Sequence, residues 1–316
     1  MKKEWNIIGN RKVFFIISTA LIVVGILFNI LFGTQLDISF KGGTLLKYSY
    51  TGTIDQNGID EIATEQLGAA ADVTLSTDGD VSVINISLVD EVELNATTAL
   101  TEALNEAYPD NALKLINSNS LAPSMGQLFF IKCLVAIGLA SLFLLIYVAL
   151  RFRKIGGLSA AVMALIALLN DILIAYFAFV IFRIPLNDNF VAVVLTILGY
   201  SLNGTIVIFD RIRENRQLMD PKTPLAELVN KSINQSLVRS FNTALCTFAA
   251  IAIVAIMALA TGMDSIISFA VPMMFGILSG FYTSTFLCGS LWVTWIEHKQ
   301  KKAAQKKNAP KSKKKA

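Results

Sequence analysis

Long apolar runs dominate the hydrophobic pattern of this chain, and one stretch of mixed periodicity interrupts them. Each run is long enough to cross the roughly 30 Å hydrocarbon core of a bilayer at about 1.5 Å per helical residue. The pattern therefore predicts six transmembrane helices, at residues 13–32, 128–150, 158–181, 190–209, 244–260 and 266–295. The last run is longer than a bilayer requires, so hydropathy does not define its ends.

The stretch of mixed periodicity, residues 34–123, alternates between a period of two and a period near 3.6. Apolar residues alternate over 46–50 and 84–88, whereas they recur at helical spacing over 59–67 and 92–104. A strand at Val73 and Leu75, before the turn 76–79, and a last strand over 113–116 complete the order βαββαβ, which predicts a ferredoxin-like α+β domain. Its acidic residues have mostly isolated spacings, so we interpret them as a solvated surface rather than a metal site.

The charges indicate how the chain is oriented in the membrane. Residues 34–123 hold fourteen acidic residues against three lysines, although the whole chain has a net charge of +4. By the positive-inside rule, basic clusters at the ends of the runs predict that both termini are cytoplasmic and that 34–123 lies outside. The clusters comprise Lys2, Lys3, Arg11 and Lys12; Arg151, Arg153 and Lys154; Arg211, Arg213 and Arg216; and the nine lysines from Lys299 to Lys315.

This topology divides the chain into four predicted parts. They are the N-terminus with the first helix (1–33), the extracytoplasmic domain (34–123), helices two to six (124–298) and a basic disordered tail (299–316). The first run has a basic start but lacks a small-x-small cleavage site, so we interpret it as an uncleaved anchor. The tail is expected to attract anionic lipid or ribosomal RNA, or simply to be solvated, and no specific nucleic-acid partner is predicted.

Composition and missing motifs narrow the classes of function. Hydrophobic residues make up 54% of the chain and charged residues 16%, which excludes an ordinary soluble domain. The three cysteines all fall in apolar runs, so no disulfide is expected outside. There is no nucleotide-binding loop, metal-ligand spacing or nucleophile triad, so we predict neither an enzyme nor a cofactor. If the protein's function requires energy, that energy must then come from an ion gradient or from a partner's ATPase.

Asp171 is the sharpest chemical feature, because it lies near the middle of the third predicted helix. An ionised side chain there is unfavourable by at least a few kcal/mol unless it is paired or hydrated. It is a candidate proton- or ion-carrying carboxylate. Alternatively, it is a neutral or hydrogen-bonded acid that holds the helices together.

Polar and small residues in the later runs are the candidate neighbours of Asp171. In the fourth run, Gly199, Asn203 and Asp210 lie on one helical stripe, which predicts close packing with a transport role in addition. Arg239, at the entry to the fifth run, can either snorkel to the surface or reach inward to a carboxylate. In the sixth run, the small residues 276–280 and the hydroxyls 283–285 are interpreted as packing residues.

Several blocks of the sequence resemble one known family. The stretch GYSLNGTIVIFDRIREN at 199–215 is similar to the fourth-span signature of the SecF family, whose members work with SecD beside the Sec translocation channel. LDISFKGGT (36–44), APSMGQ (122–127), ALLND (167–171) and NQSLVRSFNTALCT (234–247) agree in order and spacing. The resemblance marks the motif residues Gly42, Gly43, Gly199, Tyr200, Asp210, Arg211, Arg213 and Glu214, and the ion-coupling candidates Asp171, Asn203, Thr205 and Arg239.

The resemblance implies a transporter-like fold of the resistance-nodulation-division (RND) superfamily, with six spans completed to twelve by SecD. It implies a place in the bacterial cytoplasmic membrane, where such subunits use the proton or sodium gradient to draw preproteins from the SecY/SecE/SecG channel after SecA has pushed them. Three motifs depart from the family pattern. Asn203-Gly204-Thr205 replaces Asn-Asp-Thr, Asn170-Asp171 replaces His-Asp, and Ile38-Ser39-Phe40 replaces Ile-Asp-Phe.

Three hypotheses about function remain open at this point. The chain is an ion-coupled translocase subunit in which Asp171 titrates, or a scaffold subunit without ion coupling of its own. The third hypothesis, from another class, is a stand-alone RND-type transporter of small hydrophobic molecules. A single six-span half makes this last hypothesis the weakest.

Overall fold

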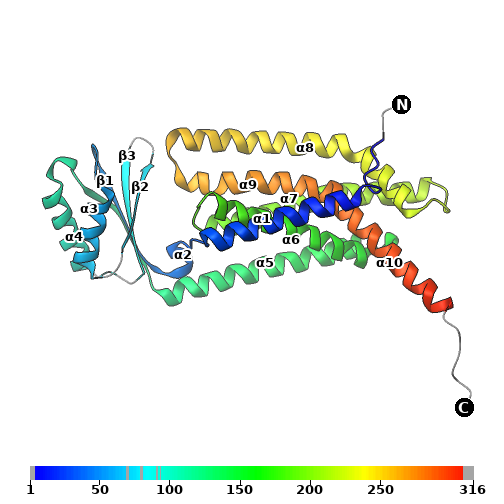
Figure 1. Ribbon diagram of the computed structural model, residues 1–316, viewed down its shortest axis with the longest axis horizontal. Coiled ribbons are helices and arrows are strands. Elements are labelled where there is room, and N and C mark those ends of the chain that lie inside the picture. Colours follow the sequence, from blue (N-terminus) through cyan, green and yellow to red (C-terminus); the bar gives the residue numbers. More distant parts are fainter. Residues whose placement is uncertain (1–3, 69–70, 79–80, 90–91, 93, 309–316) are drawn as a thin grey trace, which may run out of the picture.

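The computed structural model describes residues 4–68, 71–78, 81–89, 92 and 94–308 of this chain. Long helices lie side by side in a bundle, and a small sheet domain stands at one end of it (Figure 1). Six helices in the described residues are long and apolar enough to cross a membrane. In chain order they are α1 (Arg11–Phe32), α5 (Pro123–Arg151), α6 (Gly157–Ile181), α7 (Asp188–Leu218), α8 (Leu225–Thr261) and a last span that begins with α9 (Asp264–Tyr282).

The last span is one continuous helical rod. After α9 the chain continues as the π-helical segment η3 (Thr283–Cys288) and then as α10 (Gly289–Asn308). The helix thus enters the segment for which we expected disorder from residue 299, and residues 309–316 lie outside the described part. Lysine, alanine and glutamine are strong helix formers, so they extend an existing helix without an apolar face.

The helices α7 and α8 also extend beyond their apolar runs. The polar first half of α8 holds the N-terminal segment of the chain through two asparagine side chains. Asn230 accepts hydrogen bonds from the backbone nitrogens of Ile7 (2.8 Å) and Ile8 (3.2 Å). Asn234 accepts from the nitrogen of Trp5 and donates to its carbonyl oxygen, at 2.9 and 2.8 Å. The N-terminus is therefore fixed at the same end of the bundle as the start of α8 (Figure 1).

The sheet domain follows α1 and a single turn of helix, α2 (Ile38–Lys41). Four antiparallel strands pair in the order β2-β3-β1-β4, and the two helices α3 and α4 cover one face of the sheet (Figure 1). The elements are β1 (Gly43–Tyr50), α3 (Gln56–Leu67), β2 (Asp72–Asp78), β3 (Val81–Leu88), α4 (Leu94–Ala107), the turn η1 (Pro109–Asn111) and β4 (Lys114–Leu121).

The periodic apolar residues of the strands and of the helices pack into one core in this domain. Alternate residues of a strand share a face, so Leu46 with Tyr48 and Ile84 with Ile86 project to the same side. They are fully buried against Leu100 and other apolar residues of the two helices. The pattern in residues 34–123 thus produces the order of elements that it predicted.

Close contacts through glycine hold the membrane helices together. Gly276 on α9 lies against the side chain of Ile197 on α7, and a Cβ at Gly280 would lie 3.1 Å from the Cβ of Ser201. These contacts confirm the predicted packing role of Gly276 and Gly280. The third span, α6, is the most deeply buried, because α1, α5, α7 and α9 all pack against it. A short 3-10 turn, η2 (Arg153–Ile155), joins α5 to α6.

Candidate functional site

Asp171 lies in the middle of α6 and is completely buried among the membrane helices. Its carboxylate accepts a hydrogen bond from Ser201 Oγ on α7 and one from Ser279 Oγ on α9, each at 2.5 Å. The Oγ1 atom of Thr283, the first residue of η3, lies 2.8 and 2.9 Å from the two carboxylate oxygens. Hydroxyl groups from three elements therefore converge on a single carboxylate.

A second polar residue, Asn170, extends this arrangement to α1. Its Oδ1 accepts a hydrogen bond of 2.5 Å from Ser18 Oγ, and its Nδ2 donates to Ser279 Oγ at 3.4 Å. All the participating side chains are buried. We call this set the Asp171 network, and it consists of Ser18, Asn170, Asp171, Ser201, Ser279 and Thr283.

The Asp171 network contains no cationic side chain. None of the ion pairs among the described residues involves Asp171, and the groups that bond to it are hydroxyls. Burial of an ionised carboxylate without a partner is strongly unfavourable, so a bound proton or small cation would relieve the charge. Hydroxyl groups can both donate and accept, so they can accompany either state of the acid. The chemistry of the arrangement is therefore compatible with a proton or a small cation at the carboxylate.

The structure separates the predicted ion-coupling residues into two environments. Thr205 is buried on the side of α7 that carries Ser201, and it contacts Cys288. Asn203 and Arg239 are instead exposed on the surface of the bundle, where they line a small cavity of about 80 Å³ together with Gly204. Residues two apart on a helix face nearly opposite directions, which is why Asn203 cannot join Ser201 at the carboxylate.

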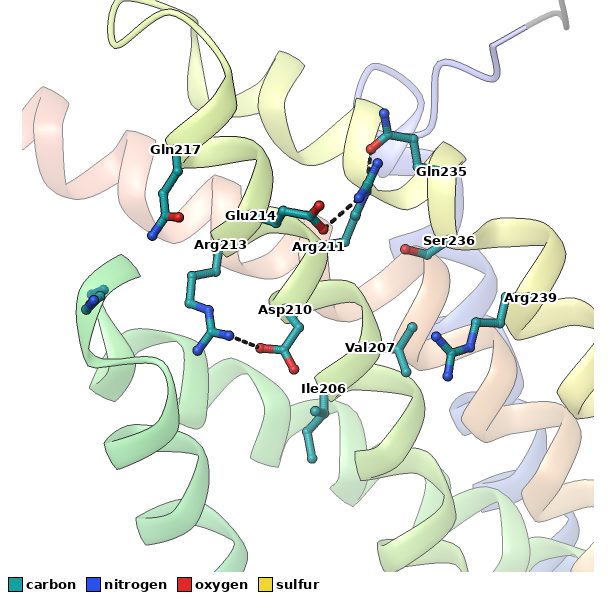
Figure 2. Close-up of a pocket in the computed structure, with 11 residues that line it drawn as sticks. Ile206, Val207, Asp210, Arg211, Arg213, Glu214, Gln217, Gln235, Ser236 and Arg239 are labelled. Atoms are coloured by element: carbon teal, nitrogen blue, oxygen red, sulfur yellow. Dashed lines mark hydrogen bonds and ion pairs between the residues drawn. The ribbon is translucent and has the colours of Figure 1, made fainter.

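The charged motif residues gather at the end of α7. Asp210 Oδ2 lies 3.2 Å from Arg151, and its other carboxylate oxygen lies 3.1 Å from Arg213. Arg211 pairs with Glu214 at 2.6 Å and donates from Nε to Gln235 at 2.6 Å (Figure 2). With residues of α8 they line an open cavity of about 870 Å³.

The glycines after α2 allow a tight turn, whereas the close packing predicted for Gly199 is not found among the described residues, since no atom lies within 4 Å of its Cβ position. Gly42 and Gly43 have φ angles of 77° and 118°, which side chains with a Cβ rarely adopt. A Cβ at Gly126 on α5 would lie 2.6 Å from the nitrogen of Gly42. The glycine pair therefore lets the chain turn into β1 close to the start of α5. Gly199 is exposed on α7, and Tyr200 lines the small cavity beside Gly204.

The hydroxyl partners of Asp171 are residues of the candidate site that sequence reasoning missed. We interpreted Ser279 and Thr283 as packing residues, and Ser201 only as part of a polar face. Ser279 and Thr283 are four residues apart, so they lie on one face of the helix. That spacing, set beside a lone intramembrane acid, was the available signal.

The fold and the network define a class of protein: six membrane-spanning helices, with a small α+β domain inserted after the first and a carboxylate buried in the bundle. The family profile described as "Protein export membrane protein SecD/SecF, C-terminal" matches residues 100–298. The chain is 32% identical to "Protein translocase subunit SecF" of Alicyclobacillus acidocaldarius, over 96% of this chain and 97% of that protein. The chain belongs to the SecD/SecF family of protein-export membrane proteins.

Two longer relatives contain a region similar to this chain. It is 31% identical to "Protein translocase subunit SecDF" of Bacillus subtilis, over 95% of this chain and 39% of that protein. Its fold matches the crystal structure of SecDF from Thermus thermophilus, described as a translocon-associated membrane protein, with a TM-score of 0.79 and 25% identity. That match covers 94% of this chain and 39% of the SecDF chain.

Proposed function

We propose that this chain is a SecF-type subunit of the Sec protein-export machinery and acts with SecD to promote preprotein translocation. The support is the similarity to proteins named SecF over nearly the full length of both chains. The chain spans only 39% of the SecDF relatives, so a second membrane unit is expected to complete it. We assign it a transport role without chemical catalysis, next to the channel formed by SecY, SecE and SecG and indirectly coupled to SecA.

A polar stripe on the outside of the bundle supports docking of SecD. Thr196, Gly199 and Asn203 are exposed along α7, and Thr243 is exposed beside them on α8. The hydroxyls of Thr196 and Thr243 donate to backbone carbonyls of their own helices. Lipid tails offer the exposed amide of Asn203 no hydrogen bonds, so another membrane-spanning chain is its better neighbour.

Cross-linking tests this docking surface. In cells that express SecD, a cysteine at Asn203→Cys should cross-link to SecD, whereas Phe143→Cys on the exposed apolar side of α5 should not. Cross-linking at position 143 alone would place the partner on the wrong face.

We infer a location in the bacterial cytoplasmic membrane, with both termini cytoplasmic and the sheet domain outside. The basic residues at one end of the bundle and the acidic composition of 34–123 support this orientation. The element order and strand order of the sheet domain support its assignment to the ferredoxin-like class. A cysteine at Thr53→Cys should react with a membrane-impermeant thiol reagent added to intact spheroplasts. Protection there, with reaction only after lysis, would invert the topology.

We further propose that Asp171 couples translocation to the ion gradient. The observation that carries this proposal is a fully buried carboxylate that is hydrogen-bonded by Ser201, Ser279 and Thr283 and has no cationic partner in the described chain. Asp171→Asn keeps the shape of the side chain but cannot exchange a proton, so gradient-dependent export should be lost. Asp220→Asn, at an exposed turn, is the matched control, and export should persist. Equal export by the two variants would remove Asp171 from the mechanism.

A scaffold subunit without its own ion coupling is the second candidate function. Gly204 favours it, because the family resemblance implies an acid there, beside Arg239 in the small cavity. A Cβ at Gly204 would lie 2.8 Å from Ser284 Oγ, so an aspartate needs extra room, which Ser284→Gly provides. If the chain is only a scaffold, Gly204→Asp combined with Ser284→Gly leaves the gradient dependence of export unchanged. A gain of gradient dependence would count against the scaffold.

A further inference from the structure

The open cavity of about 870 Å³ at the end of α7 is lined by charged side chains to which the proposed function gives no role. It lies between α7, α8 and the connection from α5 to α6, and its size is within the range of small-ligand sites. We call it the basic cavity. Its charged lining residues are Lys154, Asp210, Arg211, Arg213, Glu214 and Arg239.

The charges of the basic cavity do not balance within the described chain. Four cationic side chains line it against two carboxylates. Asp210 pairs with both Arg213 and Arg151, and Arg151 does not line the cavity. Arg239 and Lys154 form none of the ion pairs found in the described residues. The cavity therefore has an excess of positive charge, with Arg213 and Arg239 on either side of Asp210 (Figure 2).

Apolar side chains on α7 and α8 lie next to the charged residues of the basic cavity. Ile206 and Val207 are part of the cavity wall on α7. On α8, Val238, which precedes Arg239 in sequence, is 61% exposed. A cationic cavity that borders an exposed apolar helix surface suits a molecule with an anionic head and a hydrocarbon body. A soluble anion would use only the first of these features.

We propose that the basic cavity binds the phosphate group of an anionic phospholipid, with its acyl chains along Ile206, Val207 and Val238. Arginine and lysine are the side chains that bind phosphate, and basic pockets between membrane helices on the cytoplasmic side hold lipid head groups. The site is separate from the Asp171 network and does not depend on the proposed coupling. The competing occupant is a carboxylate from a partner's membrane span.

Native mass spectrometry of the purified full chain in detergent tests the proposal. Phosphatidylglycerol is titrated against phosphatidylcholine, and inorganic phosphate is added as a competitor. The pocket variant combines Lys154→Gln with Arg239→Gln. Lys12→Gln, which removes an exposed cation outside the cavity, is the control, and Arg239→Lys keeps the charge. Size-exclusion chromatography checks that each variant is folded and monodisperse.

The proposal predicts selective retention of phosphatidylglycerol by the wild-type chain, Lys12→Gln and Arg239→Lys. The pocket variant should lose affinity roughly thirtyfold, about fivefold for each removed charge. Unchanged phosphatidylglycerol binding in a folded pocket variant would overturn the proposal. So would full displacement by inorganic phosphate, which would indicate a soluble-anion site. The pocket variant is also purified from cells that express SecD. If SecD no longer co-purifies with it while its phosphatidylglycerol binding is unchanged, the cavity binds a partner's carboxylate instead.

Discussion

Two threonines of η3 test whether the hydrogen bonds to Asp171 stabilise the chain, because only one of them bonds to this carboxylate. Thr283 and Thr285 are both completely buried, two residues apart in the same π-helical segment. The hydroxyl of Thr283 lies within 2.9 Å of both carboxylate oxygens of Asp171. The hydroxyl of Thr285 has no hydrogen-bond partner among the described residues. Replacement by valine removes the hydroxyl in each case and nearly preserves the shape.

The two substitutions should change the free energy of unfolding in different directions. A hydrogen bond to a charged group contributes about 1.5–3 kcal/mol, whereas interhelical hydrogen bonds in membranes average about 0.6 kcal/mol. Thr283→Val should therefore destabilise the chain by about 1–2 kcal/mol. Thr285→Val removes a buried hydroxyl that makes no hydrogen bond, so it should be neutral or stabilise the chain by up to about 1 kcal/mol.

Reversible unfolding of the purified chain in mixed micelles, with increasing dodecyl sulfate, measures both effects. The wild-type chain and the two variants are compared under the same conditions at neutral pH. If Thr285→Val destabilises the chain as much as Thr283→Val does, the stabilisation does not come from the contact with Asp171 and the reasoning is wrong.

Two further predictions concern packing and the sheet domain. Gly276→Ala should destabilise the isolated chain by about 1–3 kcal/mol because Gly276 lies against Ile197, whereas Gly199→Ala, with no atom within 4 Å of its Cβ position, should be neutral or slightly stabilising. Unfolding in micelles measures both, and equal effects would contradict the close approach of α9 to α7. Burial raises the pKa of Tyr48, and its hydrogen bond with Thr101 partly offsets this. The folded state thus keeps this proton after an unfolded tyrosine has ionised, so stability should fall as pH rises above about 10. In thermal melts between pH 8 and pH 11, Tyr48→Phe should show a smaller alkaline loss than the wild-type chain, and identical losses would refute this role of Tyr48.

The membrane helices follow from the sequence because hydropathy is a local property. The six apolar runs correspond to six helices, and the alternating residues of 46–50 and 84–88 form neighbouring strands. Helix ends were predicted less well. The apolar runs 190–209 and 244–260 mark only the membrane portions of α7 and α8, whose polar ends continue as helix. Hydropathy is insensitive to helix formation in polar segments, which also explains the helical part of the C-terminal segment.

The site was only partly predictable, because it depends on how the helices are rotated against one another. Asp171 stands out in any reading, since a lone acid in an apolar run is conspicuous. Its partners Ser201 and Ser279 come from spans whose facing sides are set by packing at Gly276 and Gly280. Nothing local distinguishes the buried Ser201 from the exposed Asn203 two residues later. The distinction appears only when the helices are assembled.

Ion flux through the assembled complex tests the central claim about Asp171 most directly. The chain is co-purified with SecD and reconstituted into liposomes that contain a pH-sensitive dye, and a membrane potential is imposed. The account predicts proton uptake by the wild-type complex and its loss in Asp171→Asn, with Asp220→Asn behaving as the wild-type complex. Sodium flux is followed in a parallel experiment, because a buried carboxylate surrounded by hydroxyls suits either ion. Undiminished flux of both ions in the Asp171→Asn complex would contradict the account.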